Sequence, residues 1–229
     1  TESVFHSLGL TDRQAANWET GLNFVRLRRK PLVFVSPPVS GWVLAVGEAL
    51  PYPVDDCEYA EQLAVGAQFD TLMQTLAARF SEVMFFGTDR RCGFTCWVRA
   101  SGGAVERALC QVDPEVVANR GPQSAAERQL NLIDLGERAP GEEATNYLFD
   151  RLEAAQTAEE ERVAAGEDRA SAQEAVRKLI GDASFSEDHV MAMAAAWSID
   201  PESLDDIDEE GVGLVGVLPE PVGSDTIHG

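Results

Sequence analysis

A run of acidic residues near the end of the sequence could bind a cation or a basic protein. Its carboxylates belong to Asp205, Asp206, Asp208, Glu209 and Glu210. Asp206, Asp208 and Glu210 would take the first, third and fifth positions of an EF-hand calcium loop. Gly211 would take the sixth, but Val217 stands at the twelfth position, where such a loop needs a bidentate Glu. The sequence therefore argues against an EF-hand. It leaves weak divalent-cation binding as an alternative, and we expect no dedicated metal site.

The segment 211–216 matches the G-x-G-x-x-G pattern of dinucleotide-binding loops. In such loops the glycines connect a strand to a helix whose N-terminus binds the pyrophosphate. Here the preceding residues are acidic and would repel a phosphate. Pro219 and Pro221 follow the motif and prevent a helix. We therefore expect no nucleotide, and no other cofactor, at this segment.

The residues that common hydrolases use are scarce in this sequence. Its histidines are His6, His189 and His228. They form no H-E-x-x-H pair, and the sequence contains no G-x-S-x-G motif. Lys30 and Lys178 fit no phosphate-binding P-loop. The sequence thus predicts no catalytic residues, and we expect a protein that is not an enzyme.

The cysteines raise the question of a disulfide bond. They are Cys57, Cys92, Cys96 and Cys110. Cys92 and Cys96 fall four residues apart in one expected strand, which is too far for a bridge. Cys96 and Cys110 fall on neighbouring strands, where a three-residue loop would place them opposite each other and a two-residue loop on different faces. We favour reduced, buried thiols over a Cys96–Cys110 bridge.

Alternation along the strand expected over 92–99 places Trp97 and Arg99 on one face. We expect that face to lie toward solvent. Tryptophan and arginine are the residues that most often anchor protein interfaces. Trp97 and Arg99 are therefore predicted partner-binding residues, together with the acidic run defined above.

The charge of the whole chain excludes several partners. It has 18 Lys and Arg against 39 Asp and Glu, a formal net charge of -21, and no Lys or Arg follows Lys178. A surface this negative repels nucleic acids and anionic lipids, so we expect neither a nucleic-acid nor a membrane partner. Two interpretations of the acidic C-terminal part stay open. It either keeps the fold in solution or attracts a basic protein.

The first part of the sequence predicts helices and a hairpin. Thr11 opens a capping box before a helix over about 12–25. The β-branched and aromatic segments 32–35 and 42–46 flank turn residues and predict a hairpin. Apolar residues at helical spacing then predict a second helix over about 58–79.

The rest of the sequence predicts a meander followed by helices. The expected strands are 83–86, 92–99 and 105–112. An Ala- and Glu-rich helical segment follows over 141–180, and Ser184 offers a capping box for a helix that Asp200–Pro201 ends. A last short strand is expected over 214–218.

These elements indicate an α+β fold. We expect an antiparallel meander of about five to six strands, covered by helices, with a largely helical C-terminal half. The chain is expected to be a single domain over 1–229, with 141–181 as a candidate helical insertion.

Three stretches of the sequence resemble an uncharacterised family of bacterial proteins. They are 83–90, which ends in G-T-D-R, 94–100, which reads F-T-C-W-V-R-A, and 194–201, which reads A-A-A-W-S-I-D-P. This family is similar to the small acidic immunity proteins that are encoded beside secreted antibacterial toxins. The resemblance contains no catalytic motif and transfers no functional residue. It implies an antitoxin context for the chain.

The leading hypothesis is a cytoplasmic immunity protein that neutralises a basic toxin by direct binding and active-site occlusion. The absence of a signal-peptide pattern in the given sequence favours the cytoplasm. One alternative is an enzyme, hydrolase-like, with an unrecognised carboxylate site near Asp55, Asp56 and Glu58. The other alternative is a structural or scaffold subunit.

Overall fold

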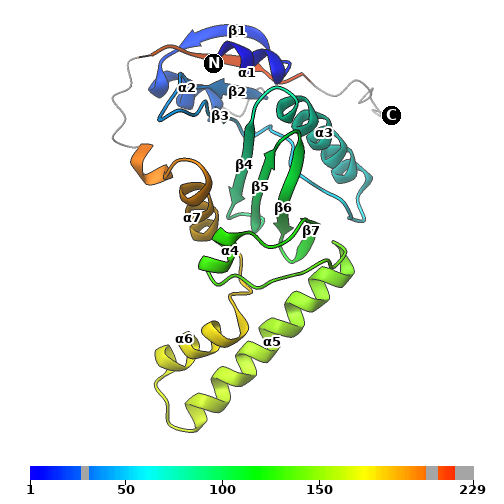
Figure 1. Cartoon of the computed structure of the whole chain (residues 1–229), viewed down its shortest axis with the longest axis vertical. Coiled ribbons are helices and arrows are strands. Elements are labelled where there is room, and N and C mark those ends of the chain that lie inside the picture. Colours follow the sequence, from blue (N-terminus) through cyan, green and yellow to red (C-terminus); the bar gives the residue numbers. More distant parts are fainter. Residues whose placement is uncertain (27–30, 205–210, 220–229) are drawn as a thin grey trace.

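The computed structural model describes residues 1–26, 31–204 and 211–219. Within these ranges the chain forms helices and two four-stranded antiparallel sheets (Figure 1). This confirms the α+β class. The strands that we expected in one sheet of about five to six strands are instead divided between two sheets of four.

The first sheet joins the two ends of the chain. Its strands, in spatial order, are β1 (Thr11–Ala16), β8 (Gly213–Val217), β2 (Leu32–Val35) and β3 (Ala45–Val46). The predicted hairpin of β2 and β3 and the predicted last strand are confirmed. A Cβ atom at Gly213 would collide with the ring of Phe34, and one at Gly216 with the ring of Phe5. Two glycines of the G-x-G-x-x-G pattern thus permit close packing in a central strand.

The predicted helix over 12–25 is wrong in its first half. Thr11 begins strand β1, which pairs with β8, so the backbone groups that a helix would use are taken by the sheet. The helix that does form, α2 (Trp18–Val25), begins after Asn17, whose side chain accepts a hydrogen bond from Thr20 N. A short helix α1 (Glu2–Ser7) precedes the sheet.

The second sheet is the predicted meander with one more strand. Its strands are β4 (Glu82–Asp89), β5 (Phe94–Ser101), β6 (Ala104–Val112) and β7 (Glu115–Arg120). Helix α3 (Ala60–Ala77) covers one face, where Phe69 and Met73 pack on Cys96 and Val98. On the other face lie α4 (Ala125–Gln129) and α7 (Glu187–Trp197) (Figure 1). Met193 of α7 packs with Trp97 in one apolar cluster.

A bulge sets the register of β5 against β6. The turn between them is the two-residue Gly102–Gly103 loop, because Ser101 pairs with Ala104. Further from the turn, between Ala100 and Arg99, the register shifts by one residue, so that Cys96 lies opposite Cys110. Both cysteines are fully buried free thiols. The bulge thus compensates for the short loop, which alone would have placed the two thiols on different faces.

Helices α5 (Glu142–Ala164) and α6 (Arg169–Ile180) form a hairpin that projects from the sheet (Figure 1). Ala144 and Leu148, in the first turns of α5, are buried in the cluster beside β7. Further along α5 the contacts are with α6, whose Ala172 and Val176 are buried. The structure confirms that 141–180 is mainly helical and shows that it is two helices.

Helix α7 begins two residues later than its predicted capping box. Ser186, and not Ser184, is the N-cap, and its hydroxyl oxygen accepts a hydrogen bond from His189 N. The helix ends at Trp197, before Pro201, as the sequence predicts. A short 3-10 helix, η1 (Pro201–Leu204), follows.

Candidate functional site

The expectation that Trp97 lies on a solvent-facing surface is wrong. Trp97 is fully buried, its indole N–H donates to Glu127 Oε1 at 3.0 Å, and its ring stands edge-on to Phe185. Helix α7 and the segment before it cover this face of the sheet. Trp97 is therefore a core residue and not an exposed anchor for a partner.

Arg99 lies on the same face, as predicted, but is engaged within the chain. Its guanidinium is 3.3 Å from Glu82 and 3.5 Å from Glu106, on the two neighbouring strands. The acidic run of Asp205, Asp206, Asp208, Glu209 and Glu210 lies outside the described residues. The structure thus does not bring together the predicted partner-binding set.

Of the three carboxylates in the enzyme hypothesis, that of Asp55 forms part of an ion-pair cluster. Arg120 of β7 pairs with Asp55 and, at 2.6 Å, with Asp70 of α3. Hydrogen bonds from Arg120 to Asp55, and then to Asp70, raise the pKa of the guanidinium above its ordinary value. Arg120 thus links Asp55 and helix α3 to β7 through ion pairs, which indicates a structural role.

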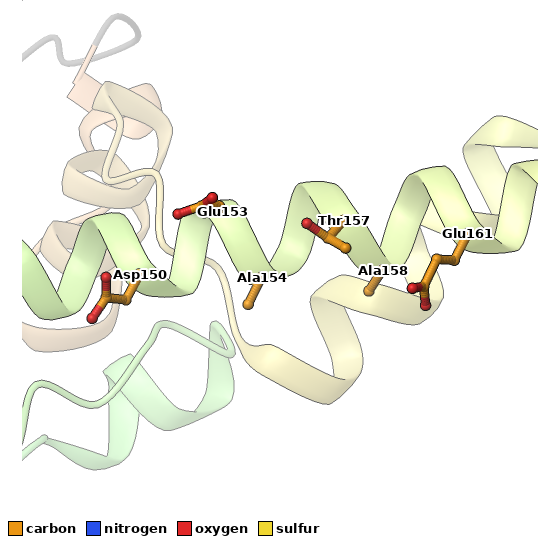
Figure 2. A pocket seen from close by; sticks show the side chains of 6 residues that line it. All are labelled: Asp150, Glu153, Ala154, Thr157, Ala158 and Glu161. Atoms are coloured by element: carbon orange, nitrogen blue, oxygen red, sulfur yellow. The ribbon is translucent and has the colours of Figure 1, made fainter.

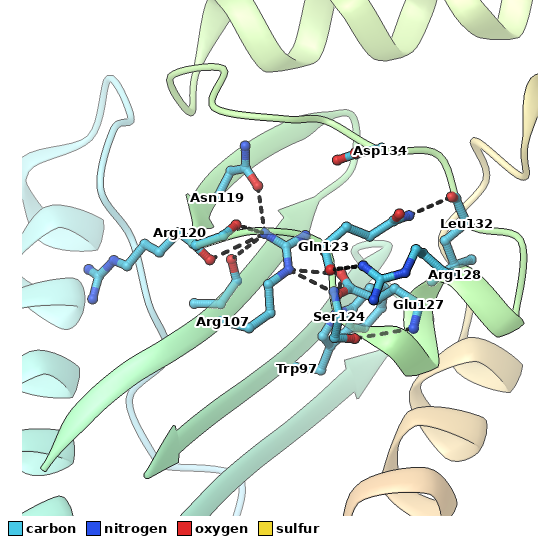
Figure 3. Close-up of polar contacts among 12 residues, drawn as sticks. Trp97, Arg107, Asn119, Arg120, Gln123, Ser124, Glu127, Arg128, Leu132 and Asp134 are labelled. Carbon is cyan, nitrogen blue, oxygen red and sulfur yellow. Dashed lines mark hydrogen bonds and ion pairs between the residues drawn. The ribbon is translucent and has the colours of Figure 1, made fainter. Parts of the chain in front are cut away.

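A buried polar network, which the sequence analysis did not predict, lies beside Trp97 (Figure 3). Arg107 of β6 and Glu127 of α4 form an ion pair in which Arg107 Nε lies 2.9 Å from Glu127 Oε1. Glu127 Oε2 also accepts from Ser124 N at 2.6 Å, which completes a capping box. The same guanidinium donates to Asn119 Oδ1 at 2.8 Å. The motif S-x-x-E at 124–127 was the sequence signal for part of this network.

This network is satisfied from within the chain. Glu127 and Arg107 are 1% and 5% exposed, and both carboxylate oxygens have donors. Such a pair leaves little capacity for a substrate. Its position between the sheet and α4 indicates a structural role.

A cleft opens between the turn after β4 and the first turn of α7. Its volume is about 340 Å³. Its lining residues are Thr88, Asp89, Arg90, Gly93, Phe94, Thr95, Phe185, Ser186, Glu187 and Asp188. Three carboxylates thus face one guanidinium, that of Arg90, which pairs with Glu187 across the cleft.

The inner side of this cleft is polar. Thr88 of β4 pairs with Thr95 of β5, and Thr95 pairs with Gln111 of β6, so three polar residues follow one another across the sheet. Thr95 is 6% exposed, and its hydroxyl has no hydrogen-bond partner among the described residues. Sequence reasoning missed this site because its two sides are about a hundred residues apart. The available signal was a polar residue two positions before Trp97, and therefore on the same face.

A serine, a histidine and an aspartate also meet beside the cleft. Ser186 Oγ lies 3.2 Å from His189 Nδ1, and His189 Nε2 lies 3.6 Å from Asp182 Oδ2. The second distance is too long for the hydrogen bond that would orient a catalytic histidine. Ser186 Oγ also accepts the N–H of His189 as the helix cap. The arrangement is explained by capping of α7.

A second concave surface follows the projecting helix α5 (Figure 2). It is shallow, has a volume of about 430 Å³, and is lined by Asp150, Glu153, Ala154, Thr157, Ala158 and Glu161. Asp150, Glu153 and Glu161 are exposed and have neither a hydrogen-bond nor an ion-pair partner among the described residues. We call these six residues the α5 groove. Its lining contains carboxylates and no basic side chain.

In residues 1–26, 31–204 and 211–219, no three His, Cys, Asp or Glu side chains are grouped so that they could hold a metal ion. None of the helices described there is long and apolar enough to cross a bilayer.

Comparison with protein-family models, with curated proteins and with solved structures found no match to this chain. The resemblance to immunity proteins therefore stays a prediction.

Proposed function

We propose that this chain is an acidic cytoplasmic binding protein of the immunity type. In this proposal it neutralises a toxin that has a basic surface by binding it directly and covering its active site. The α5 groove is the contact surface that the described residues favour.

The observation that carries the proposal is the unpaired state of the carboxylates in the α5 groove. Elsewhere the arginines are largely used within the chain, as in the Arg107–Glu127 and Arg120–Asp55 pairs. Asp150, Glu153 and Glu161 have no such neighbour in the described structure. With a net charge of -21, the chain holds too few cations to neutralise them. Their charge is therefore available to a basic partner.

The shape of α5 supports the same role. Ala154 and Ala158 lie one turn apart between the carboxylates (Figure 2). Side chains this small let another backbone approach the helix closely, while its Lys or Arg side chains reach the carboxylates on either side. The one-signed field also accelerates encounter with a basic protein, because electrostatic steering acts mainly on the association rate.

A charge-neutralised variant tests this proposal. The probe is the purified product of a toxin-domain gene adjacent to the gene for this chain, whose presence the proposal requires. Asp150→Asn, Glu153→Gln and Glu161→Gln together are expected to weaken binding at least about tenfold and to slow association. Calorimetry and stopped-flow kinetics at about 50 and about 300 mM NaCl measure both effects, and wild-type affinity should fall as salt rises.

The matched control removes the same charge elsewhere. Glu19→Gln, Glu61→Gln and Glu115→Gln neutralise three exposed carboxylates on α2, α3 and β7. This control variant should bind almost as tightly as the wild type. Equal weakening by both triple variants would show that net charge, and not the α5 groove, drives binding. Lack of any binding between wild-type chain and toxin would overturn the proposal.

A further inference from the structure

We propose that the cleft between the β4–β5 turn and α7 is a pocket for a basic side chain, with arginine as the preferred occupant. For its biological role the inference rests on the proposed function, since a toxin with a basic surface would supply the side chain. The test below uses a small ligand and needs no toxin.

The first observation is the unpartnered hydroxyl of Thr95. Thr95 lines the cleft, is 94% buried, and has a side-chain oxygen with no partner among the described residues. Buried polar groups are almost always hydrogen-bonded, because leaving one unpaired costs the desolvation of that group. A ligand N–H that enters the cleft would give this oxygen the donor that the chain does not provide.

The second observation is charge, which selects a cation over an anion. The N-terminus of α7 would by itself favour an anion. Its first turn, however, carries Glu187 and Asp188, and Asp89 stands on the opposite side of the cleft. Asp89 is itself paired with Arg91. Even with Arg90 and Arg91 both counted, the three carboxylates of the lining outnumber the guanidinium groups, so a phosphate or carboxylate ligand would be disfavoured.

The third observation is that a guanidinium already lies at the rim. Arg90 Nε donates to Glu187 Oε2, from a side chain that is 82% exposed. Because this pair lies in water, it holds Arg90 only weakly, and a partner arginine could replace it. Phe185 also lines the cleft and offers an aromatic ring to a cation.

The volume agrees with a single side chain. About 340 Å³ is near the lower end of small-ligand pockets, which span ~300–1,000 Å³. A planar guanidinium has five N–H donors, so it can donate to Thr95 and to a carboxylate at once, which an ammonium does less readily. This difference is the reason to expect arginine to bind more tightly than lysine.

The test is an NMR titration of the full chain. The ligands are N-acetyl-arginine amide, N-acetyl-lysine amide, N-acetyl-glutamine amide as the neutral control, and inorganic phosphate. We expect arginine amide to shift the backbone amides of residues 93–95 and 185–188, lysine amide to shift them more weakly, and glutamine amide and phosphate to leave them unmoved. The arginine affinity should fall as NaCl is raised.

Two substitutions identify the hydroxyl as the cause. Thr95→Val keeps the shape of the side chain and is expected to lower the arginine affinity about threefold to tenfold, the effect of one lost hydrogen bond. The variant should fold, because it removes a buried polar atom that has no partner. Thr75→Val, an exposed position on α3 at the opposite face of the sheet, is the matched control and should bind arginine amide like the wild type.

Three results would overturn the inference. The first is that phosphate shifts the same backbone amides. The second is that glutamine amide shifts them as much as arginine amide does. The third is that Thr95→Val binds arginine amide as tightly as the wild type. Failure here is distinguishable from failure of the proposed function. If the cleft does not bind arginine amide but the α5 groove still binds toxin, only the proposed arginine pocket is wrong.

Discussion

Arg107 and Glu127 form a bidentate ion pair that connects the middle of the second sheet to α4, with both side chains almost fully buried. Trp97 and Ser124 donate to the same carboxylate, and the guanidinium reaches the backbone oxygens of Arg120 and Gly121 (Figure 3). Each charged atom thus has a partner. This is the condition under which a buried pair can be tolerated.

Removal of one member of this pair should destabilise the fold strongly. Glu127→Ala leaves the Arg107 charge buried and the Trp97 N–H unpaired, so we expect a loss of about 3–5 kcal/mol in the free energy of unfolding. Urea denaturation measures it. Glu82→Ala breaks an exposed pair with Arg99 and should cost about 0–1 kcal/mol. Similar values for the two variants would contradict the structural role assigned to the network.

The N-cap of α6 makes the stability of that helix depend on pH. Asp168 accepts the backbone N–H of Ser171 at 3.0 Å, and this hydrogen bond lowers the pKa of the carboxyl group. A lowered pKa in the folded state means that the stabilisation is fully present above the unfolded value. It is lost as the pH falls through the folded value.

The Ser171 amide reports this titration directly. The midpoint of its NMR shift change should lie below about pH 3.9, the ordinary value for an aspartate. Asp168→Asn keeps an accepting oxygen but cannot ionise, so the pH-dependent shift should disappear while α6 stays helical. A midpoint at or above the ordinary aspartate value would show that the cap does not hold the carboxylate in its charged form.

The four thiols should differ in reactivity according to their burial. Cys92 is exposed, Cys57 is half-buried, and Cys96 and Cys110 are fully buried. Burial, followed by contact with Cys110, raises the pKa of the Cys96 thiol well above its ordinary value. Because the thiolate is the reactive form, Cys96 should be the least reactive thiol.

Alkylation followed by mass spectrometry measures these differences. With iodoacetamide under native conditions, Cys92 should be modified first and Cys57 more slowly. Cys96 and Cys110 should react only after denaturation. Rapid native labelling of Cys96 would contradict the burial, and its recovery bonded to Cys110 without added oxidant would contradict the interpretation of reduced thiols.

Elements with a clear local pattern could be predicted from the sequence. Helix α3, strands β4 to β6 and the end of α7 lie close to their expected positions, because hydrophobic periodicity and a proline define them locally. Strand β1 was mistaken for helix, since its pairing with β8 depends on residues about two hundred positions away. A capping pattern at Thr11 could not reveal that competition.

The candidate sites depended even more on tertiary placement. Alternation correctly placed Trp97 and Arg99 on one face, but only the packing of α7 decided that Trp97 is buried. Thr95 lines a cleft because β5 and α7 lie side by side there, and no local sequence pattern predicts that contact. The α5 groove is exposed because helix α5 projects from the sheet. The sequence indicated only that this segment is helical and acidic.

The exposed pair of Arg90 with Glu187 leads to a prediction about the cleft. If Arg90 occupies the rim in place of a partner arginine, then Arg90→Ala frees Glu187 and removes a competing charge. The affinity for N-acetyl-arginine amide should rise about 1.4-fold to fivefold, which corresponds to the ~0.2–1 kcal/mol of an exposed pair. Arg13→Ala breaks an exposed pair with Glu2 in the first sheet region and changes the net charge equally, so it is the control. It should leave the affinity almost unchanged. A fall in affinity in Arg90→Ala would mean that Arg90 helps to hold the bound arginine, and would contradict the idea that the two guanidinium groups compete for Glu187.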